Sequence, residues 1–241
     1  MMRKTLVERG FRVITPTLLN ATRVKNEYRT ADTVREDRLR ILGAYLLHDF
    51  SDEWMGQNIF KVVFYHGFYG LGSTKRNASN KSRDTGRVDF TKLTFLYTRY
   101  QYLPHNFGLL FVAEGQWSAS PLLAPERFSV GGAPFNRTYP LATLTGDSGY
   151  QGKLELKYHF VDIDFLNNVT LYGYYSNGRV WNRRPTSDEK GSLWIDGASF
   201  GVRSVITNNL TAFVEYSLPF KRKVGGVAIN NKTYVGLHLS F

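Results

Sequence analysis

The chain has 241 residues, with 31 lysines and arginines against 20 aspartates and glutamates, which gives a formal net charge of +11. It contains no cysteine, which excludes a disulfide scaffold and a cysteine-based metal or redox site. No apolar run approaches the roughly 18 residues that a membrane-spanning helix needs. Aromatic residues make up 15% of the chain, which argues against disorder. An aromatic-rich, basic β-protein remains.

Apolar and polar residues alternate with a period of two along most of the chain, which is the period of a strand. Between Tyr150 and Phe160, for example, every second residue is apolar or glycine, and the residues between them are polar or charged. Many of the predicted strands are near the ~9–11 residues that a tilted membrane-spanning strand needs. After one or two less definite strands before residue 31, the pattern predicts strands at 39–50, 59–70, 90–101, 106–118, 150–160, 168–181, 194–206, 210–218 and 232–241.

The connections between these strands alternate in length, with short turns at one end of the strands and long polar loops at the other. This layout is typical of an outer-membrane barrel, so the sequence predicts an all-β fold, an antiparallel transmembrane β-barrel. Many of the lysines and arginines fall in the long loops, where we expect a solvated rim or a contact with anionic lipid, including lipopolysaccharide. The long loops are 71–89, 119–149, 182–193 and 219–231.

The last predicted strand ends on an aromatic residue after an alternating apolar series. This pattern is typical of the strand that closes a bacterial outer-membrane barrel, and it predicts an assembly signal for the barrel assembly machinery. A soluble β-fold binding module stays open as an alternative, because alternation does not say which face meets water. The predicted signal residues are Val235, Leu237, Leu239 and Phe241.

Other functional classes find little support in the residues. The aromatic residues recur on the apolar faces of strands, which argues against single-stranded nucleic acid as a partner. The five histidines are scattered without metal-site spacing. The segment Gly146–Gly149 resembles a serine-protease nucleophile segment, but no histidine lies in a protease-like context. We therefore expect no enzyme, no catalytic residue, no metal and no cofactor.

The region 119–149 holds three motifs in a fixed order, built on Phe128, Gly131 and Gly132, then Asn136, Arg137, Thr138 and Tyr139, then Gly146, Asp147 and Gly149. These motifs resemble the sixth extracellular loop of two-partner-secretion outer-membrane transporters of the haemolysin-activator ShlB/FhaC/HecB family. Further short segments between residues 54 and 118 also look like that family, and the resemblance runs from about residue 38 to the end of the chain. A later segment resembles the inner-wall motif of the family, through Tyr174, Ser176 and Gly178.

The resemblance implies a sixteen-stranded barrel preceded by two POTRA domains. We expect residues 1–241 to form one partial barrel domain, the C-terminal ten or eleven strands, without the POTRA domains and the signal peptide. The implied function is secretion of a large unfolded exoprotein, of haemolysin or adhesin type, through a pore in the Gram-negative outer membrane. The exoprotein would be recognised by the POTRA domains. The alternatives are a Bam-type assembly barrel and a diffusion porin.

The resemblance also implies that the long loop folds into the lumen and that Arg137 contacts the inner-wall motif. Gly131 and Gly132 would let the backbone turn tightly. Ser176 stands where the family has an aspartate, however, so the guanidinium needs another acceptor. The alternation offers Glu114 and Glu155 on the polar wall, and an ordinary surface arginine is the remaining alternative.

Overall fold

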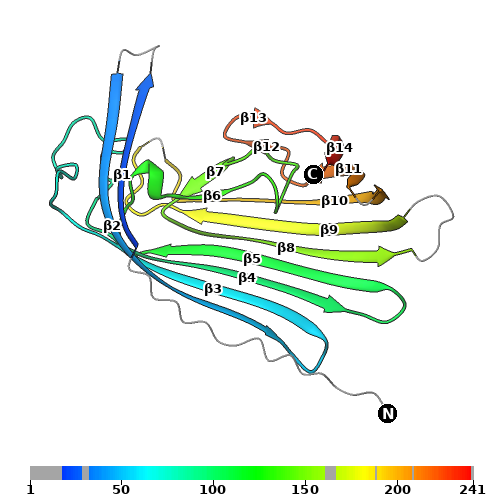
Figure 1. Cartoon of the computed structure of the whole chain (residues 1–241). Helices are drawn as coiled ribbons and strands as arrows, with labels where there is room; N and C mark the ends of the chain where they lie inside the picture. Colours follow the sequence, from blue (N-terminus) through cyan, green and yellow to red (C-terminus); the bar gives the residue numbers. More distant parts are fainter. Residues whose placement is uncertain (1–17, 29–32, 161–166, 188, 208, 240–241) are drawn as a thin grey trace.

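A computed structural model describes residues 18–28, 33–160, 167–187, 189–207 and 209–239. Ten strands form one antiparallel sheet in which each strand pairs with the next along the chain (Figure 1). Their order is β1 (Leu18–Tyr28), β2 (Thr33–Ser51), β3 (Gly56–Gly67), β4 (Thr91–Tyr102), β5 (Phe107–Ser118), β8 (Ser148–His159), β9 (Asn167–Trp181), β10 (Ser192–Thr207), β11 (Leu210–Pro219) and β14 (Lys232–Leu239).

The predicted strands are confirmed, and the largest difference in their boundaries lies in β2. The pattern starts that strand at residue 39, whereas the strand begins at Thr33. Residues 35–38 are all charged, so they show no alternation. Hydrogen-bond partners extend the strand instead: Arg38 pairs with Arg23 of β1, and its carbonyl accepts from the backbone of Thr74.

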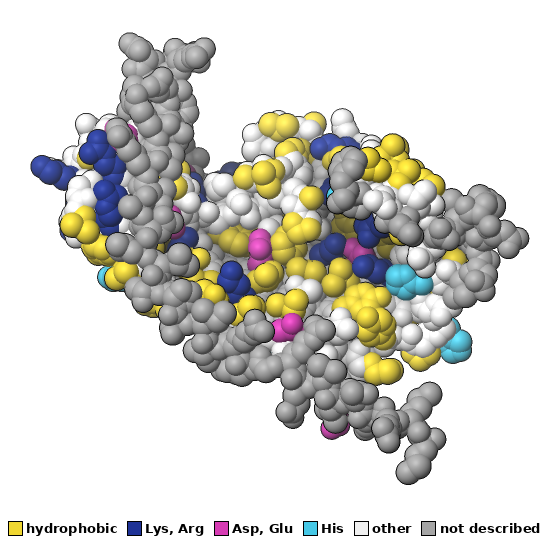
Figure 2. All heavy atoms as spheres, viewed as in Figure 1, with side chains coloured by type: hydrophobic (Ala, Val, Ile, Leu, Met, Phe, Trp, Pro, Cys, Tyr) yellow, Lys and Arg dark blue, Asp and Glu magenta, His cyan; other side chains and the backbone are white. Residues whose placement is uncertain are grey.

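The sheet curves, with β1 and β14 at its two edges (Figure 1). Its concave side is hollowed in the space-filling view (Figure 2). Alternation gives this sheet an outer face of exposed apolar side chains and an inner face that is polar and aromatic. The outer face includes Phe64, Phe95, Phe111, Leu154, Phe200 and Val214. An apolar surface that is exposed along the whole sheet is the surface that lipid would cover.

Charged side chains of both signs lie in the hollow among hydrophobic ones (Figure 2). Several of the cations stand over aromatic rings of neighbouring strands, an arrangement that offsets part of the cost of removing a cation from bulk water. The distances from cation to ring centroid are 5.0 Å for Lys153 and Tyr174, 5.2 Å for Arg203 and Tyr172, and 5.6 Å for Lys61 and Tyr45.

The long connections contain elements that are too short to show a period-two pattern in the sequence. These are the 3₁₀ turn η1 (Ala124–Glu126) and the strands β6 (Phe128–Val130), β7 (Leu144–Gly146), β12 (Lys223–Val224) and β13 (Val227–Ala228). The long connections also contribute to a buried apolar cluster. In it, Val130, Tyr139 and Leu144 pack with Val180, Ile195, Val224 and Ile229. Among the described residues, no helix has the length and apolar character that crossing a membrane requires.

Candidate functional site

The connection from 119 to 149 lies against the concave side of the sheet, where β6 and β7 cross β8 and β9 (Figure 1). The approach is close enough to require glycine. A Cβ atom at Gly178 would stand only 2.4 Å from Cγ1 of Val130. One at Gly149 would stand 2.5 Å from Cδ1 of Phe128. The glycine of the inner-wall motif therefore makes room for the loop.

The turn that brings the loop back is built on Gly131, which has a φ of +108°, a conformation that side-chain-bearing residues rarely adopt. The amide of Gly131 donates to Oε1 of Gln151 on β8 at 3.2 Å. Gly132 also has a positive φ, and Gly146 packs against Val180. The glycines of the loop thus have defined structural roles, as a turn and as points of contact with the wall.

The end of the loop farthest from its two attachments, which we call the tip, carries Arg137. The guanidinium Nη1 lies 3.6 Å from Oε2 of Glu215 on β11, and its central carbon lies 4.9 Å from the ring centroid of Phe213. The carbonyl oxygen of Arg137 accepts from the hydroxyl of Tyr234 on β14 at 2.5 Å. The tip therefore rests on β11 and β14, near one edge of the sheet.

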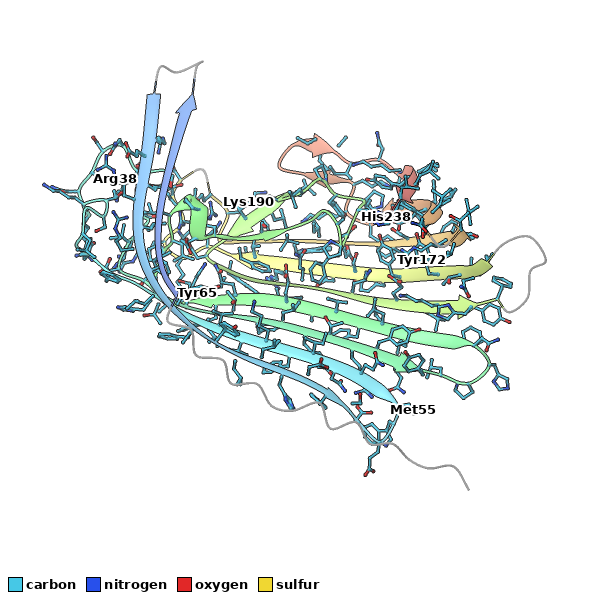
Figure 3. All side chains as sticks on the ribbon, in the orientation of Figure 1. Arg38, Met55, Tyr65, Tyr172, Lys190 and His238 are labelled. Atoms are coloured by element: carbon cyan, nitrogen blue, oxygen red, sulfur yellow. The ribbon has the colours of Figure 1, made fainter. Side chains whose placement is uncertain are left out.

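Glu215 is almost fully buried, and hydroxyl groups hold its carboxylate in place. Tyr172 donates to Oε2 at 3.0 Å, and Tyr174 donates to Oε1 at 2.9 Å. Ser217 adds a third bond, at 3.2 Å to Oε1. Figure 3 marks Tyr172 on β9. These donors hold the carboxylate in one orientation. A specific contact with a guanidinium requires an acceptor that is fixed in this way.

The acceptors that the sequence offered for Arg137 are wrong. Glu155 is bound by Lys153 at 2.7 Å and by Lys157 at 3.3 Å, and Glu114 accepts from Gln151 at 2.7 Å. Alternation correctly put both carboxylates on the inner wall. It could not say that the tip lies over β11 rather than over β5 and β8.

Ser176 is buried on the inner wall, and its hydroxyl faces the carbonyl oxygen of Gly197 at 3.4 Å. Of the inner-wall motif, Tyr174 is the residue that reaches the tip, through the carboxylate of Glu215. The negative charge that Arg137 contacts is therefore supplied by Glu215 of β11, and β11 lies two strands away from β9 in the sheet. Glu215 shares its face of the strand with Phe213 and Ser217 and alternates with Val214 and Tyr216, so the signal for a polar-wall acid existed there as well.

The other tip residues are buried and anchor the loop. Asn136 accepts from the amide of Thr138 at 3.2 Å, and Thr138 is fully buried. The hydroxyl of Tyr139 lies 2.9 Å from the carbonyl of Asp196 and 3.0 Å from that of Lys221, and it accepts from the amide of Lys221 at 3.2 Å. Burial raises the pKa of Tyr139 to about 12, so its hydroxyl stays protonated and able to donate.

The two ends of the loop meet at a set of buried and half-buried charges, which we call the root cluster: Arg83, Arg127, Asp147 and Glu189. Asp147 is fully buried and lies 2.8 Å from Nη1 of Arg83. Glu189 lies 2.8 Å from Arg83 and 3.2 Å from Arg127. Burial raises the pKa of Glu189, but the hydrogen bonds and charges of the two arginines outweigh it and hold the pKa below its usual value.

Sequence reasoning named Asp147 but missed its partners. Arg83 belongs to the connection between β3 and β4, and it was expected on a solvated rim. It is buried instead, as is Lys81 beside it. No spacing rule connects Arg83 to Asp147, because the two residues lie in different loops, and only the folded chain brings them together.

Part of the predicted C-terminal signal can be described. Val235, Leu237 and Leu239 alternate on the outer face of β14, where their side chains are exposed. Phe241 lies outside the described residues. Alternation along β14 is therefore present as predicted, and its role in assembly remains a prediction.

The chain is similar to known proteins in both sequence and fold. A model of the haemolysin secretion/activation protein family ShlB/FhaC/HecB matches residues 34–204. The outer membrane transporter CdiB of Dickeya dadantii (strain 3937) is 28% identical over 149 residues, which are 62% of this chain and 26% of that protein. The chain thus spans about a quarter of the length of this curated relative.

A solved structure, CdiB from Escherichia coli, superposes with a TM-score of 0.70 over 86% of this chain and 38% of that one, at 19% identity. At that identity the likeness concerns the fold, and it confirms the predicted class, an antiparallel transmembrane β-barrel whose sheet is not closed in the described residues. Since the family match covers well over half of the sequence, the chain belongs to the ShlB/FhaC/HecB haemolysin secretion/activation family.

Proposed function

We propose that this chain forms the wall of a pore through which a large, unfolded exoprotein of haemolysin or adhesin type leaves a Gram-negative cell by two-partner secretion. Family membership supports export over the alternatives of an assembly barrel, a diffusion porin and a soluble binding module. The relative CdiB of Dickeya dadantii is an outer membrane transporter, which supports the same location for this chain. The step needs neither ATP nor a catalytic residue.

The observation that carries the proposal is the loop 119–149 on the concave wall, with Arg137 at Glu215. In a closed barrel, a loop in that place stands in the path of a passing polypeptide. The proposed role of the contact is to set where the loop stands. A carboxylate that is held by Tyr172, Tyr174 and Ser217 gives the arginine one position to occupy.

Secretion by the transporter that carries this sequence tests the role of Glu215. Glu215→Gln keeps the shape and removes the charge, so we expect the amount of exoprotein in the medium to fall by about twofold to fivefold, the size expected when a partly exposed charge pair is lost. Glu155→Gln is the matched control, because that acid lies on the same wall but is bound to Lys153 and Lys157. Equal secretion by the two variants would contradict the role of Glu215. Absence of any exoprotein in the medium with the unaltered chain would contradict export.

The partners follow from the same proposal. The exoprotein passes through the hollow, and lipid, including lipopolysaccharide, covers the exposed apolar face. The barrel assembly machinery recognises the alternating apolar residues at the end of the chain: Val235, Leu237, Leu239 and Phe241. Leu237→Asp should lower the yield of folded protein in the outer membrane, measured by heat-modifiable migration on a gel. An unchanged yield would remove this segment from the assembly step.

A further inference from the structure

Arg83 makes contacts that its place in the chain does not suggest. It lies in the connection between β3 and β4, yet its side chain is buried. The guanidinium reaches the end of the loop 119–149 at Asp147, and it reaches the connection between β9 and β10 at Glu189. One side chain thus joins three connections that are far apart in the sequence.

All three nitrogens of this guanidinium are used. Nη1 donates to both carboxylate oxygens of Asp147, at 2.8 and 3.0 Å, and lies 3.3 Å from the carbonyl of Leu122. Nε and Nη2 donate to Oε2 of Glu189 at 3.1 and 2.8 Å, and Nη2 also reaches the carbonyl of Arg183 at 3.2 Å. A planar fork of donors can serve partners in several directions at once, whereas a lysine is a single point of charge.

Asp147 has a matching set of acceptor bonds. Besides Arg83, it accepts from the amide of Leu122 at 2.7 Å and from the amide of Arg183 at 2.7 Å. Leu122 stands near the start of the loop 119–149 and Asp147 near its end. The carboxylate therefore closes the loop at its base, and Arg83 supplies the charge that lets this carboxylate stay buried.

The cluster balances two arginines against two acids, because Arg127 also pairs with Glu189. The members of the cluster come from connections rather than from the paired strands of the main sheet. The hydrogen-bond ladders of that sheet therefore do not depend on Arg83, while the place of the loop does.

We propose that Arg83 is a positioning residue, which keeps the loop 119–149 seated on the inner wall by holding Asp147. This inference rests on the proposed function and deepens it, because a transporter whose loop sets its state depends on what holds that loop. No contact of Arg83 with the exoprotein is required. The effect passes through Asp147 and Glu189, and through the backbone carbonyls of Leu122 and Arg183.

A disulfide between the loop and the wall reports the seating directly. The chain has no cysteine of its own, and a Cβ at position 178 would stand 2.4 Å from Cγ1 of Val130, so cysteines at the two positions lie within reach of one disulfide. Val130→Cys also removes a methyl group of Val130, which relieves the crowding that a side chain at 178 would otherwise cause. Val130→Cys with Gly178→Cys should cross-link on brief oxidation of isolated outer membranes. Adding Arg83→Ala should lower the yield of the cross-link on the order of tenfold, because it leaves the buried carboxylate of Asp147 without its charged partner and leaves Glu189 with Arg127 alone.

The controls separate seating from folding and from transport. Arg87→Ala removes a cation from the same connection, but the side chain of Arg87 pairs with Asp89, so the yield should not change. Heat-modifiable migration shows whether each barrel has folded. If Arg83→Ala fails to fold, Glu189→Gln and Arg83→Lys weaken the same contacts more gently and should give intermediate yields.

The outcomes are distinct. A yield in Arg83→Ala equal to that of the parent, or a loss no larger than that in Arg87→Ala, would overturn the positioning role. A folded Arg83→Ala barrel with a low yield of the cross-link and reduced secretion would support it. If the unaltered chain secretes nothing, the proposed function fails, while the cross-link still decides what Arg83 does.

Discussion

The loop 119–149 is attached at two places by arginine–carboxylate contacts, and the two contacts differ in burial and in geometry. At the root cluster, Arg83 and Asp147 are both buried, and two short bonds join them. At the tip, the side chain of Arg137 is 31% exposed and lies 3.6 Å from Glu215. A buried pair costs several kcal/mol to break, whereas a partly exposed contact of that length contributes about 1 kcal/mol or less.

This difference indicates a loop that is fixed at its base and more easily released at its tip. Segments that move in a functional cycle come from the less stable parts of a fold. The side chain of Arg137 can therefore leave Glu215 while the root cluster and the buried residues of the tip keep the loop over the same part of the sheet. Tyr139 should hold the loop with a strength between those of the two charge pairs, because its ring is buried but its hydroxyl contacts backbone groups and no charged side chain.

The largest effect is expected from Asp147→Ala. This variant leaves Arg83 buried without its carboxylate and leaves the amides of Leu122 and Arg183 without an acceptor. The free energy of seating the loop should fall by about 3–5 kcal/mol. Protease cleavage within 119–149 in intact outer membranes, compared with the unaltered chain, measures it. A smaller loss of seating free energy than in Arg137→Ala would mean that the tip holds the loop more strongly than the root cluster does.

A middle-sized effect is expected from Gly178→Ala, because the added methyl meets Val130 at 2.4 Å. Overpacking of this kind costs about 1–3 kcal/mol. Hydrogen exchange of the loop amides should increase, and the second substitution Val130→Ala should reverse much of the change. Gly173→Ala on the same strand is the control, because its Cβ would meet no atom closer than 3.7 Å. Equal exchange in both single variants would show that the close approach is not needed.

The main sheet could be predicted from the sequence because each of its strands carries its own signal. Alternation is local: Tyr150, Leu154 and Leu156 show the strand β8 without reference to any other part of the chain. It also assigns side chains to the two faces, so Glu114, Glu155 and Glu215 were all identifiable as inner-wall acids.

The partners of the loop could not be predicted, because they depend on which strand lies under which part of it. Arg137 finds Glu215 across 78 positions of sequence, and Arg83 finds Asp147 across 64. A lysine or arginine in a long polar loop usually meets water, and that expectation fails for Arg83 because two acids from other loops surround it.

A smaller effect on seating is expected from Arg137→Ala. The contact is long and partly exposed, so the free energy of seating should change by about 0.5–1 kcal/mol. A double-mutant cycle with Glu215→Gln isolates the pair, and its coupling energy should be no more than about 1 kcal/mol. The measurement is the same protease cleavage within 119–149. A coupling energy near that of the root cluster would mean that the loop is held equally at both places.

The smallest effect on the loop is expected from Asp52→Asn, in the turn between β2 and β3 at the opposite end of the strands. Asp52 binds Arg99, and this hydrogen bond lowers the pKa of the carboxyl from 3.8 to about 2. A folded-state pKa below the ordinary value means that the contribution to stability is fully present above pH 3.8 and is lost as the pH falls through about 2. Thermal unfolding should therefore distinguish the two chains near neutral pH and converge at about pH 2, while cleavage of the loop stays the same. A change in loop cleavage would show that the turn end is coupled to the root cluster, and the comparison would then extend along the whole barrel wall.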